Sequence, residues 1–188
     1  MAMAAKVISF SLNAASIDRA IREIKQYAAE LNDQCALLRK KVAERIRWSA
    51  SEGFRRAITS DVIGKVDGKN IISAEPVPND VSVTVENNDT MSVVIANGSQ
   101  AVFIEYGAGV YHNGPAGDSP HPWGLQQGFA IGAYPANSVP SKGVRAVWGY
   151  KSGKDIILTH GTPAAMPMYR GAEEAIRALD EIAREVFG

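Results

Sequence analysis

The chain has 188 residues and a mass of 20.1 kDa, which fits a single domain covering residues 1–188. Its 20 lysines and arginines equal its 20 aspartates and glutamates, which argues against a freestanding nucleic-acid binder because such proteins normally show a basic excess. The hydrophobic fraction of 46% is ordinary for a globular protein and excludes a disordered tail.

The sequence also bears on disulfide bonds, membrane spans and secretion. The single cysteine, Cys35, excludes an intramolecular disulfide. No window approaches the roughly 18 uncharged apolar residues of a membrane span. No long apolar run follows the first residues, so we expect neither a secretory signal nor a membrane partner.

Residues 6–12 form the first patterned segment. Apolar side chains alternate there with serines, and this period of two predicts a short strand with one buried face. Either Asn13 or Ser16 then offers a side-chain oxygen that can cap a following helix.

A long helix over residues 14–58 is the strongest periodic signal in the chain. Apolar residues step by four and three positions, the spacing of a coiled-coil seam. We call this set the heptad stripe: Ile17, Ile21, Ile24, Ala28, Leu31, Cys35, Leu38 and Val42. Such a helix would be roughly 65 Å long if unbroken, whereas a compact domain of this size has a radius of gyration of about 16 Å. We therefore expect the helix to bend near Asn32 and Asp33 or to project toward another subunit.

The middle of the chain is predicted to be a small antiparallel sheet. Residues 59–80 carry several glycines and prolines and are predicted to be a loop. Residues 81–106 then read as a meander of three strands, the first two joined by turn residues at 87–89 and the third covering 101–106.

An extended loop is predicted over residues 107–143. Eight of its 37 residues are glycine and five are proline, and it carries almost no charge. A loop this long in a compact domain is usually functional or mobile. Its aromatic residues suggest a segment that docks on another protein: Tyr111, Trp123, Phe129 and Tyr134.

The chain closes with two predicted strands in residues 144–159 and an amphipathic helix over 167–187. The fold class is therefore α+β. We expect a small antiparallel sheet packed with the long N-terminal helix and the C-terminal amphipathic helix, together with the long Gly/Pro-rich loop.

The neutral total charge conceals a local polarity. Residues 37–56 carry seven basic and two acidic side chains, whereas residues 166–188 carry three basic and five acidic ones. The basic face can be simply solvated, pair with the acidic C-terminal helix, pair with a neighbouring subunit, or face a phosphate backbone. The candidates for a surface that faces DNA or lines a channel are Lys40, Lys41, Arg45 and Arg47.

Signatures of enzymes are missing from the sequence. Residues 149–155 resemble a phosphate-binding loop, but the glycines are one residue too close and Asp155 stands where Ser or Thr would hold magnesium. Gly107 and Gly109 lack the third glycine and the following helix of a dinucleotide fingerprint. We expect no cofactor and no enzymatic activity.

The individual residues that could bind a metal or act in catalysis are better explained by structural roles. His112, His121, His160 and Asp118 match no short metal-ligand spacing, so no metal site is expected. Cys35 lies on the heptad stripe, where a free cysteine packs as a small hydrophobe. Glu105 has no second carboxylate placed near it, so an edge or interface position is favoured over a general acid. The predicted oligomer interface comprises Ile17, Ile21, Ile24, Leu31, Leu38, Val42, Glu105 and Tyr106.

Two segments resemble one known family. Residues 101–108, AVFIEYGA, resemble the signature "tyrosine-alanine, apolar, Val-Glu-aromatic-Gly-Thr" of the HK97 gp10-like tail-component family of tailed bacteriophages. Residues 162–172, TPAAMPMYRGA, resemble the Pro-Phe-apolar-Arg-Pro-Ala segment that leads into that family's last helix. Ala108 stands where the family has threonine, and Gly171 where it has proline.

The resemblance implies a virion structural protein at the neck or the tail end. Such proteins form a homo-oligomeric ring, typically a hexamer, around the DNA channel, contact neck, connector or tail-tube proteins, and are assembled in the host cytoplasm. Transient contact with DNA in the channel is compatible with this role. Two other hypotheses stay open: a DNA-binding module that uses the basic face of residues 37–56, and an enzyme with a site in the 107–143 loop built on His121 and Glu105.

Overall fold

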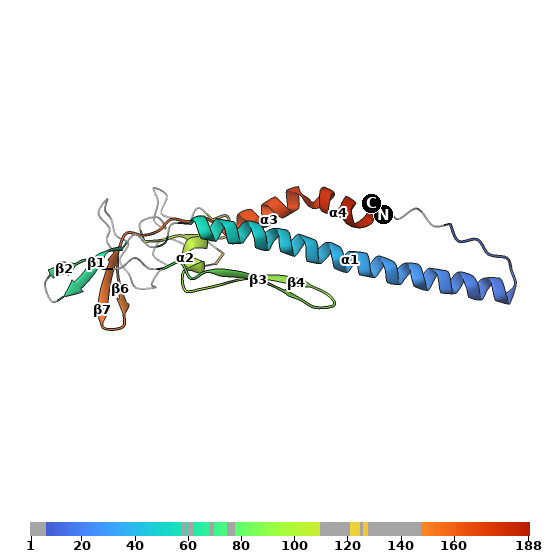
Figure 1. Ribbon diagram of the computed structural model, residues 1–188, viewed down its shortest axis with the longest axis horizontal. Coiled ribbons are helices and arrows are strands. Elements are labelled where there is room, and N and C mark those ends of the chain that lie inside the picture. Colours follow the sequence, from blue (N-terminus) through green and yellow to red (C-terminus); the bar gives the residue numbers. More distant parts are fainter. Residues whose placement is uncertain are drawn as a thin grey trace.

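The molecule is built around one long helix. The computed structural model describes residues 7–57, 59, 62–67, 70–74, 78–109, 121–124, 126–127 and 148–188. Helix α1 (Ala14–Arg56) runs for 43 residues, or about 65 Å, and the other elements gather around its C-terminal half (Figure 1). The α+β fold class predicted from the sequence is confirmed.

Helix α1 begins at a local cap and continues without a break. The side-chain oxygen of Asn13 accepts a hydrogen bond from the backbone N–H of Ser16 at 2.9 Å. The predicted bend near Asn32 and Asp33 is wrong, because both residues lie inside the continuous helix. The other predicted alternative, a projecting helix, is the one observed: the first half of α1 extends beyond the other helices and strands (Figure 1).

The strand predicted at residues 6–12 is also wrong. Residues 7–12, which the structure describes, form no strand, and Val7 and Leu12 are exposed. Instead, the N–H of Ser11 donates to the hydroxyl of Ser16 inside α1, so this segment serves the start of the helix. None of the strands in the described part of the chain pairs with this segment, so its apolar alternation forms no ladder.

A β-hairpin and a pair of helices cover opposite sides of α1. The hairpin of β3 (Ser82–Asn87) and β4 (Ser92–Asn97) packs on one side, as predicted. Helices α3 (Pro167–Arg177) and α4 (Leu179–Phe187) pack on the other side (Figure 1). The predicted helix over 167–187 is thus confirmed in place but divided at Ala178.

The third strand predicted at residues 101–106 is wrong, because these residues form helix α2 (Ala101–Tyr106). Gly98 turns the chain away from the hairpin with a φ of 145°. The carboxylate of Asp80 accepts the N–H groups of Ser99 and Gln100, which fixes the approach to α2. The Asp80 pKa is lowered chiefly by these bonds from Ser99.

A four-stranded antiparallel sheet lies past the C-terminal end of α1 (Figure 1), in the order β2-β1-β7-β6. Strands β6 (Trp148–Ser152) and β7 (Asp155–Thr159) confirm the prediction for the described part of 144–159. Strands β1 (Val62–Asp67) and β2 (Asn70–Ile72) show that the loop predicted at 59–80 was partly wrong. A further short ladder joins β5 (Ala108–Gly109) to β8 (Gly161–Thr162), so the loop predicted over 107–143 is wrong at its start. Residues 110–120, 125 and 128–143 of that predicted loop lie outside the described residues.

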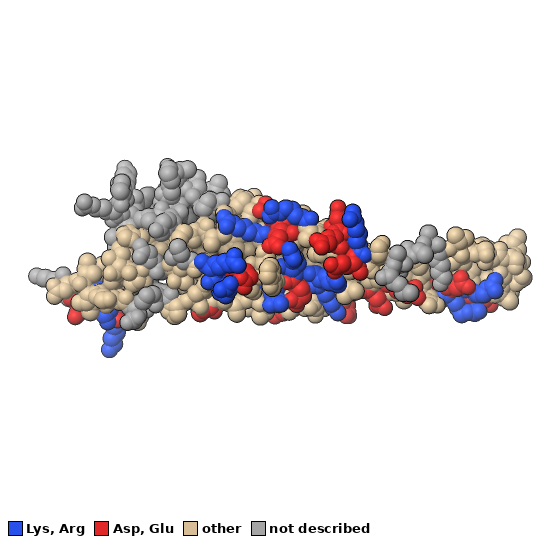
Figure 2. Space-filling view, turned by 45° about the horizontal axis from the view of Figure 1, so that its top comes forward, with Lys and Arg blue, Asp and Glu red and all other residues tan. Residues whose placement is uncertain are grey.

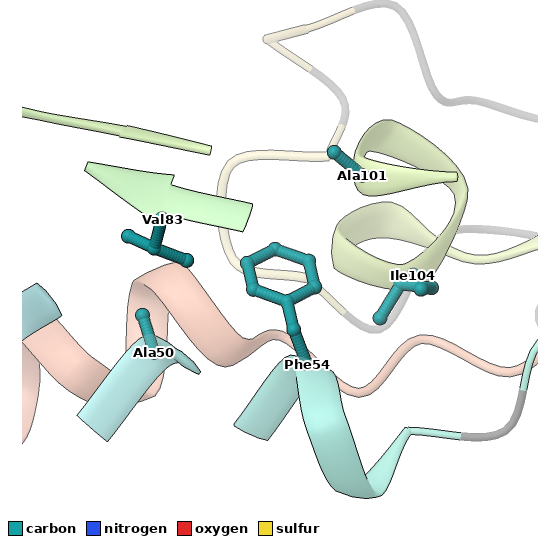
Figure 3. Close-up of a cluster of buried hydrophobic side chains, with 5 residues drawn as sticks. All are labelled: Ala50, Phe54, Val83, Ala101 and Ile104. Atoms are coloured by element: carbon teal, nitrogen blue, oxygen red, sulfur yellow. The ribbon is translucent and has the colours of Figure 1, made fainter. Parts of the chain in front are cut away.

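The hydrophobic core lies where α1, the hairpin and α2 meet. Figure 3 shows the ring of Phe54 between Val83 of β3 and Ile104 of α2. Phe54 and Ile104 are fully buried, and burial of a side chain of this size stabilises the fold by roughly 1.5–3 kcal/mol. Ala50 and Ala101 complete the cluster with small side chains, which lets these elements approach closely.

Close contact between α1 and α3 depends on two glycines. A Cβ atom at Gly53 would lie 2.7 Å from the Cβ of Pro167, the first residue of α3. A Cβ atom at Gly171 would lie 3.1 Å from the carbonyl oxygen of Ile46 on α1. The proline ring cannot move aside as a flexible side chain would, so Gly53 is the tighter of the two positions.

We predict that Gly53→Val lowers the free energy of unfolding by roughly 2 kcal/mol, because overpacking at Pro167 outweighs the better helix propensity of valine. The control is Ala29→Val at an exposed position of α1, which should change stability by less than about 1 kcal/mol. Urea unfolding at one fixed protein concentration measures both variants. Equal stability of the two would contradict the close contact.

Candidate functional site

A buried, hydrogen-bonded pair of side chains lies beside α2. Glu105, on α2, and His121 are separated by 3.0 Å between Oε1 and Nε2, and both side chains are almost fully buried. The enzyme hypothesis named these two residues, and the structure brings them together. The sequence placed Glu105 at an edge or interface, whereas in the single chain it lies in the interior.

The Glu105 carboxylate caps helix α3. Its Oε2 accepts the N–H of Met168 at 2.8 Å, and its Oε1 accepts the N–H of Tyr169 at 2.9 Å. Helix α3 has no side-chain cap of its own, because Met166 at the cap position (φ 55°) has no side-chain oxygen to accept the first N–H groups. Glu105 therefore supplies, from another element, both the acceptors and the negative charge that a helix N-terminus favours.

The hydrogen bonds of His121 define its tautomer. Its Nδ1 accepts the backbone N–H of Trp123 at 3.1 Å, so the ring proton lies on Nε2 and is donated to Glu105. The imidazole is surrounded by aromatic rings, with centroids 4.4 Å away at Tyr106 and 5.3 Å away at Tyr169. Burial and the nearby Glu105 charge raise the pKa of Tyr106.

This arrangement joins three parts of the chain: α2, the segment 121–124 and the start of α3. Both oxygens of Glu105 accept hydrogen bonds, and both ring nitrogens of His121 are engaged. A general base needs a lone pair directed at substrate, and here these lone pairs are directed at backbone and side-chain donors. Within the described ranges, no group of three His, Cys, Asp or Glu side chains is placed to hold a metal ion.

An open groove lies next to this pair, between β4, α2 and α3. We call it the apolar groove; its volume is about 570 Å³. The exposed side chains on its walls are mainly hydrophobic, including Trp123 at 52%, Val102 at 50% and Val93 at 41% of full exposure. Further lining residues are Phe54, Val94, Ala101, Tyr106, Met168 and Tyr169. Pockets of this size and character are typical binding sites.

The heptad stripe divides into two parts. Leu38 and Val42 lie where α1 is covered by other elements, and they are partly buried. The remaining large residues retain 36–55% of their full exposure, and we call them the exposed stripe: Ile17, Ile21, Ile24 and Leu31. The projecting half of α1 carries this stripe (Figure 1).

The basic face of α1 is largely matched by acids of the same chain. Lys41 pairs with Glu185 of α4 and Arg45 with Glu174 of α3, each at 2.6 Å. Arg47 pairs with Glu44 on α1 itself, and Lys40 is exposed. Figure 2 shows blue and red side chains intermixed where α3 and α4 lie on α1. Of the alternatives drawn from the sequence, pairing with the acidic C-terminal helices accounts for Lys41 and Arg45.

Of the predicted docking-loop aromatics, Trp123 is the one that the structure describes, and it lines the apolar groove. Tyr111, Phe129 and Tyr134 lie outside the described residues, as do His112 and Asp118. The groove itself was not predicted, because its walls come from helix α2, read as a strand, and from segments far apart in the sequence.

Comparison of the chain with models of protein families, with curated proteins and with solved structures gives no match. Among the described residues, no helix combines the length and the hydropathy needed to cross a lipid bilayer.

We predict that Glu105→Gln lowers the free energy of unfolding by roughly 2 kcal/mol. The amide keeps one acceptor oxygen, so one N–H of the α3 N-terminus loses its partner, and the negative charge at that terminus is lost. Glu86→Gln, at an exposed position of β3, should be nearly neutral. Chemical unfolding of the three proteins measures the difference, and a Glu105→Gln variant as stable as Glu86→Gln would exclude the capping role.

A second prediction concerns the pH dependence of the α1–α3 contact. Hydrogen bonding from Ser49, followed by the charge of Arg45, lowers the pKa of Glu174. A carboxylate with a lowered pKa in the folded state stabilises the protein above its ordinary pKa of about 4.3, and this contribution is lost as the pH falls below that value. Glu174→Gln should therefore be less stable than the wild type at pH 7, and the difference should shrink on acidification. A difference that is constant between pH 7 and pH 3 would refute this assignment.

Proposed function

We propose that this chain is a structural protein of a tailed-phage virion: a neck or tail-completion subunit that forms a ring, typically a hexamer, around the DNA channel and connects head and tail. The observation that carries the proposal is the exposed stripe on the projecting half of α1. In this role the protein is not an enzyme and needs no cofactor, and its partners are copies of itself and neighbouring neck, connector or tail-tube proteins.

The exposed stripe favours association. Apolar residues at heptad spacing gain free energy when a second surface removes them from water, by about 25 cal/mol for each Å² buried. A contiguous exposed apolar surface on a folded chain marks an interaction site. A projecting helix with such a stripe suits subunits that meet their neighbours in a closed ring.

The two segments that resemble the phage family are neighbours in space. Ala108 of β5 pairs with Thr162 of β8, and the N–H of Ala165 donates to the carbonyl of Ile104 at 2.8 Å. Glu105, in the first segment, caps the helix that begins in the second. Residues that form one packed unit have a physical reason to occur together, which supports interpreting the two motifs as one signature.

DNA binding through the basic face of α1 is the less favoured function. The phosphate backbone would have to compete with Glu185 for Lys41 and with Glu174 for Arg45. The acidic partners also reduce the local positive potential that steers a protein toward DNA. Transient contact with DNA inside the channel remains compatible with the ring.

We predict that the wild-type protein is a homo-oligomer and that Ile21→Asp/Ile24→Asp dissociates it to monomers, because two buried carboxylates would replace apolar contacts. Size-exclusion chromatography with light scattering gives the mass, and negative-stain electron microscopy shows whether rings are present. Circular dichroism should show retained helix, since both positions are exposed in the single chain.

Ile176→Asp is the matched control, because this α3 isoleucine is 71% exposed and lies off the stripe. It should assemble like the wild type. A wild-type protein that stays monomeric over a wide concentration range and is absent from purified virions would exclude the proposed function.

A further inference from the structure

We infer that the exposed stripe of one subunit binds in the apolar groove of the next, so that each subunit donates a helix face and accepts one. This inference rests on the proposed function, because it names the surfaces through which the ring closes. The occupant of the groove is therefore residues 17–31 of a second copy of this chain.

The groove has the shape and chemistry to receive a helix. It is open, has a volume of about 570 Å³ and is lined by residues of α1, β4, α2, the segment 121–123 and α3. Apart from its tyrosines, its ionisable lining residues are Glu105 and His121, which are bonded to each other. An uncharged, apolar helix face can thus enter without leaving a buried charge unpaired.

The stripe has the complementary form. Ile17, Ile21 and Ile24 follow the spacing i, i+4, i+7, by which an amphipathic helix anchors in a groove, and Leu31 continues the same face. The stripe carries no charge, and the carboxylate of Glu105 in the groove wall is already bonded to His121 and to the N-terminus of α3. Both surfaces retain substantial exposure in the single chain.

The two surfaces cannot meet within one chain. The stripe ends at Leu31, the groove includes Ile46 of the same helix, and the unbroken α1 keeps these residues about 22 Å apart. Contact therefore requires a second copy. Because the two surfaces differ, the contact is head-to-tail, and repetition of such a contact closes a ring or extends a filament. Pairing of two stripes with each other would instead form a symmetric dimer and leave both grooves open.

A mixing experiment separates these arrangements. The stripe variant is Ile21→Asp/Ile24→Asp, which keeps an intact groove; the groove variant is Val102→Asp, which keeps an intact stripe. Each alone should be monomeric, with the self-association constant weakened by at least ~100-fold. Mixed in equal amounts, they should form one-to-one heterodimers and nothing larger, since a single intact stripe–groove pair remains.

Light scattering measures these masses, with circular dichroism to confirm that each variant is folded. Val93→Asp, on β4, gives a second groove variant, and Ile176→Asp is again the control that should assemble normally. A groove variant that still assembles like the wild type, or a mixture that stays monomeric, overturns the inference while leaving the proposed ring in place. A wild type that stays monomeric over a wide concentration range overturns the inference, and its absence from purified virions as well overturns the proposed function.

Discussion

The packing of the molecule's body depends on one buried carboxylate. Glu105 joins α2 to the start of α3, although the bonded residues are 63 and 64 positions apart in the sequence. It also holds His121, and through it the backbone of Trp123. Without this acceptor the first N–H groups of α3 would be desolvated and unpaired, which is costly in a protein interior. The carboxylate therefore sets where α3 begins.

The position of α3 in turn determines how it meets α1. Pro167 lies against Gly53, and Gly171 lies against the backbone of the preceding turns of α1, so the two helices approach each other closely at these two glycines. On the preceding turns of α1, Lys41 forms an ion pair with α4 and Arg45 forms one with α3. The basic and acidic residues that cancel in the net charge of the chain are thus, in part, paired with each other in the folded protein.

Features set by local periodicity could be predicted from the sequence: α1, with Asn13 as one of two candidate caps, the β3–β4 hairpin and the C-terminal helix. Features set by distant contacts could not. Residues 101–106 are predicted as a strand but form α2, because Asp80, Gly98 and the core around Phe54 determine their conformation. Glu105 and His121 were recognised as a possible pair, whereas the capping of α3 was not, because nothing near Glu105 in the sequence indicates which N–H groups it will accept.

The continuity of α1 has a geometric consequence. In an uninterrupted helix each residue adds 1.5 Å of length and about 100° of rotation. The continuous 43-residue helix therefore sets two quantities: the distance between the exposed stripe and the elements packed on its C-terminal half, and the rotation of the stripe about the helix axis relative to those elements. Insertion of a single residue between Leu31 and Ile46 would turn the stripe by more than a quarter of a revolution, whereas a seven-residue insertion would nearly restore its direction. The segment between the two surfaces is thus constrained in its length even where its side chains are exposed.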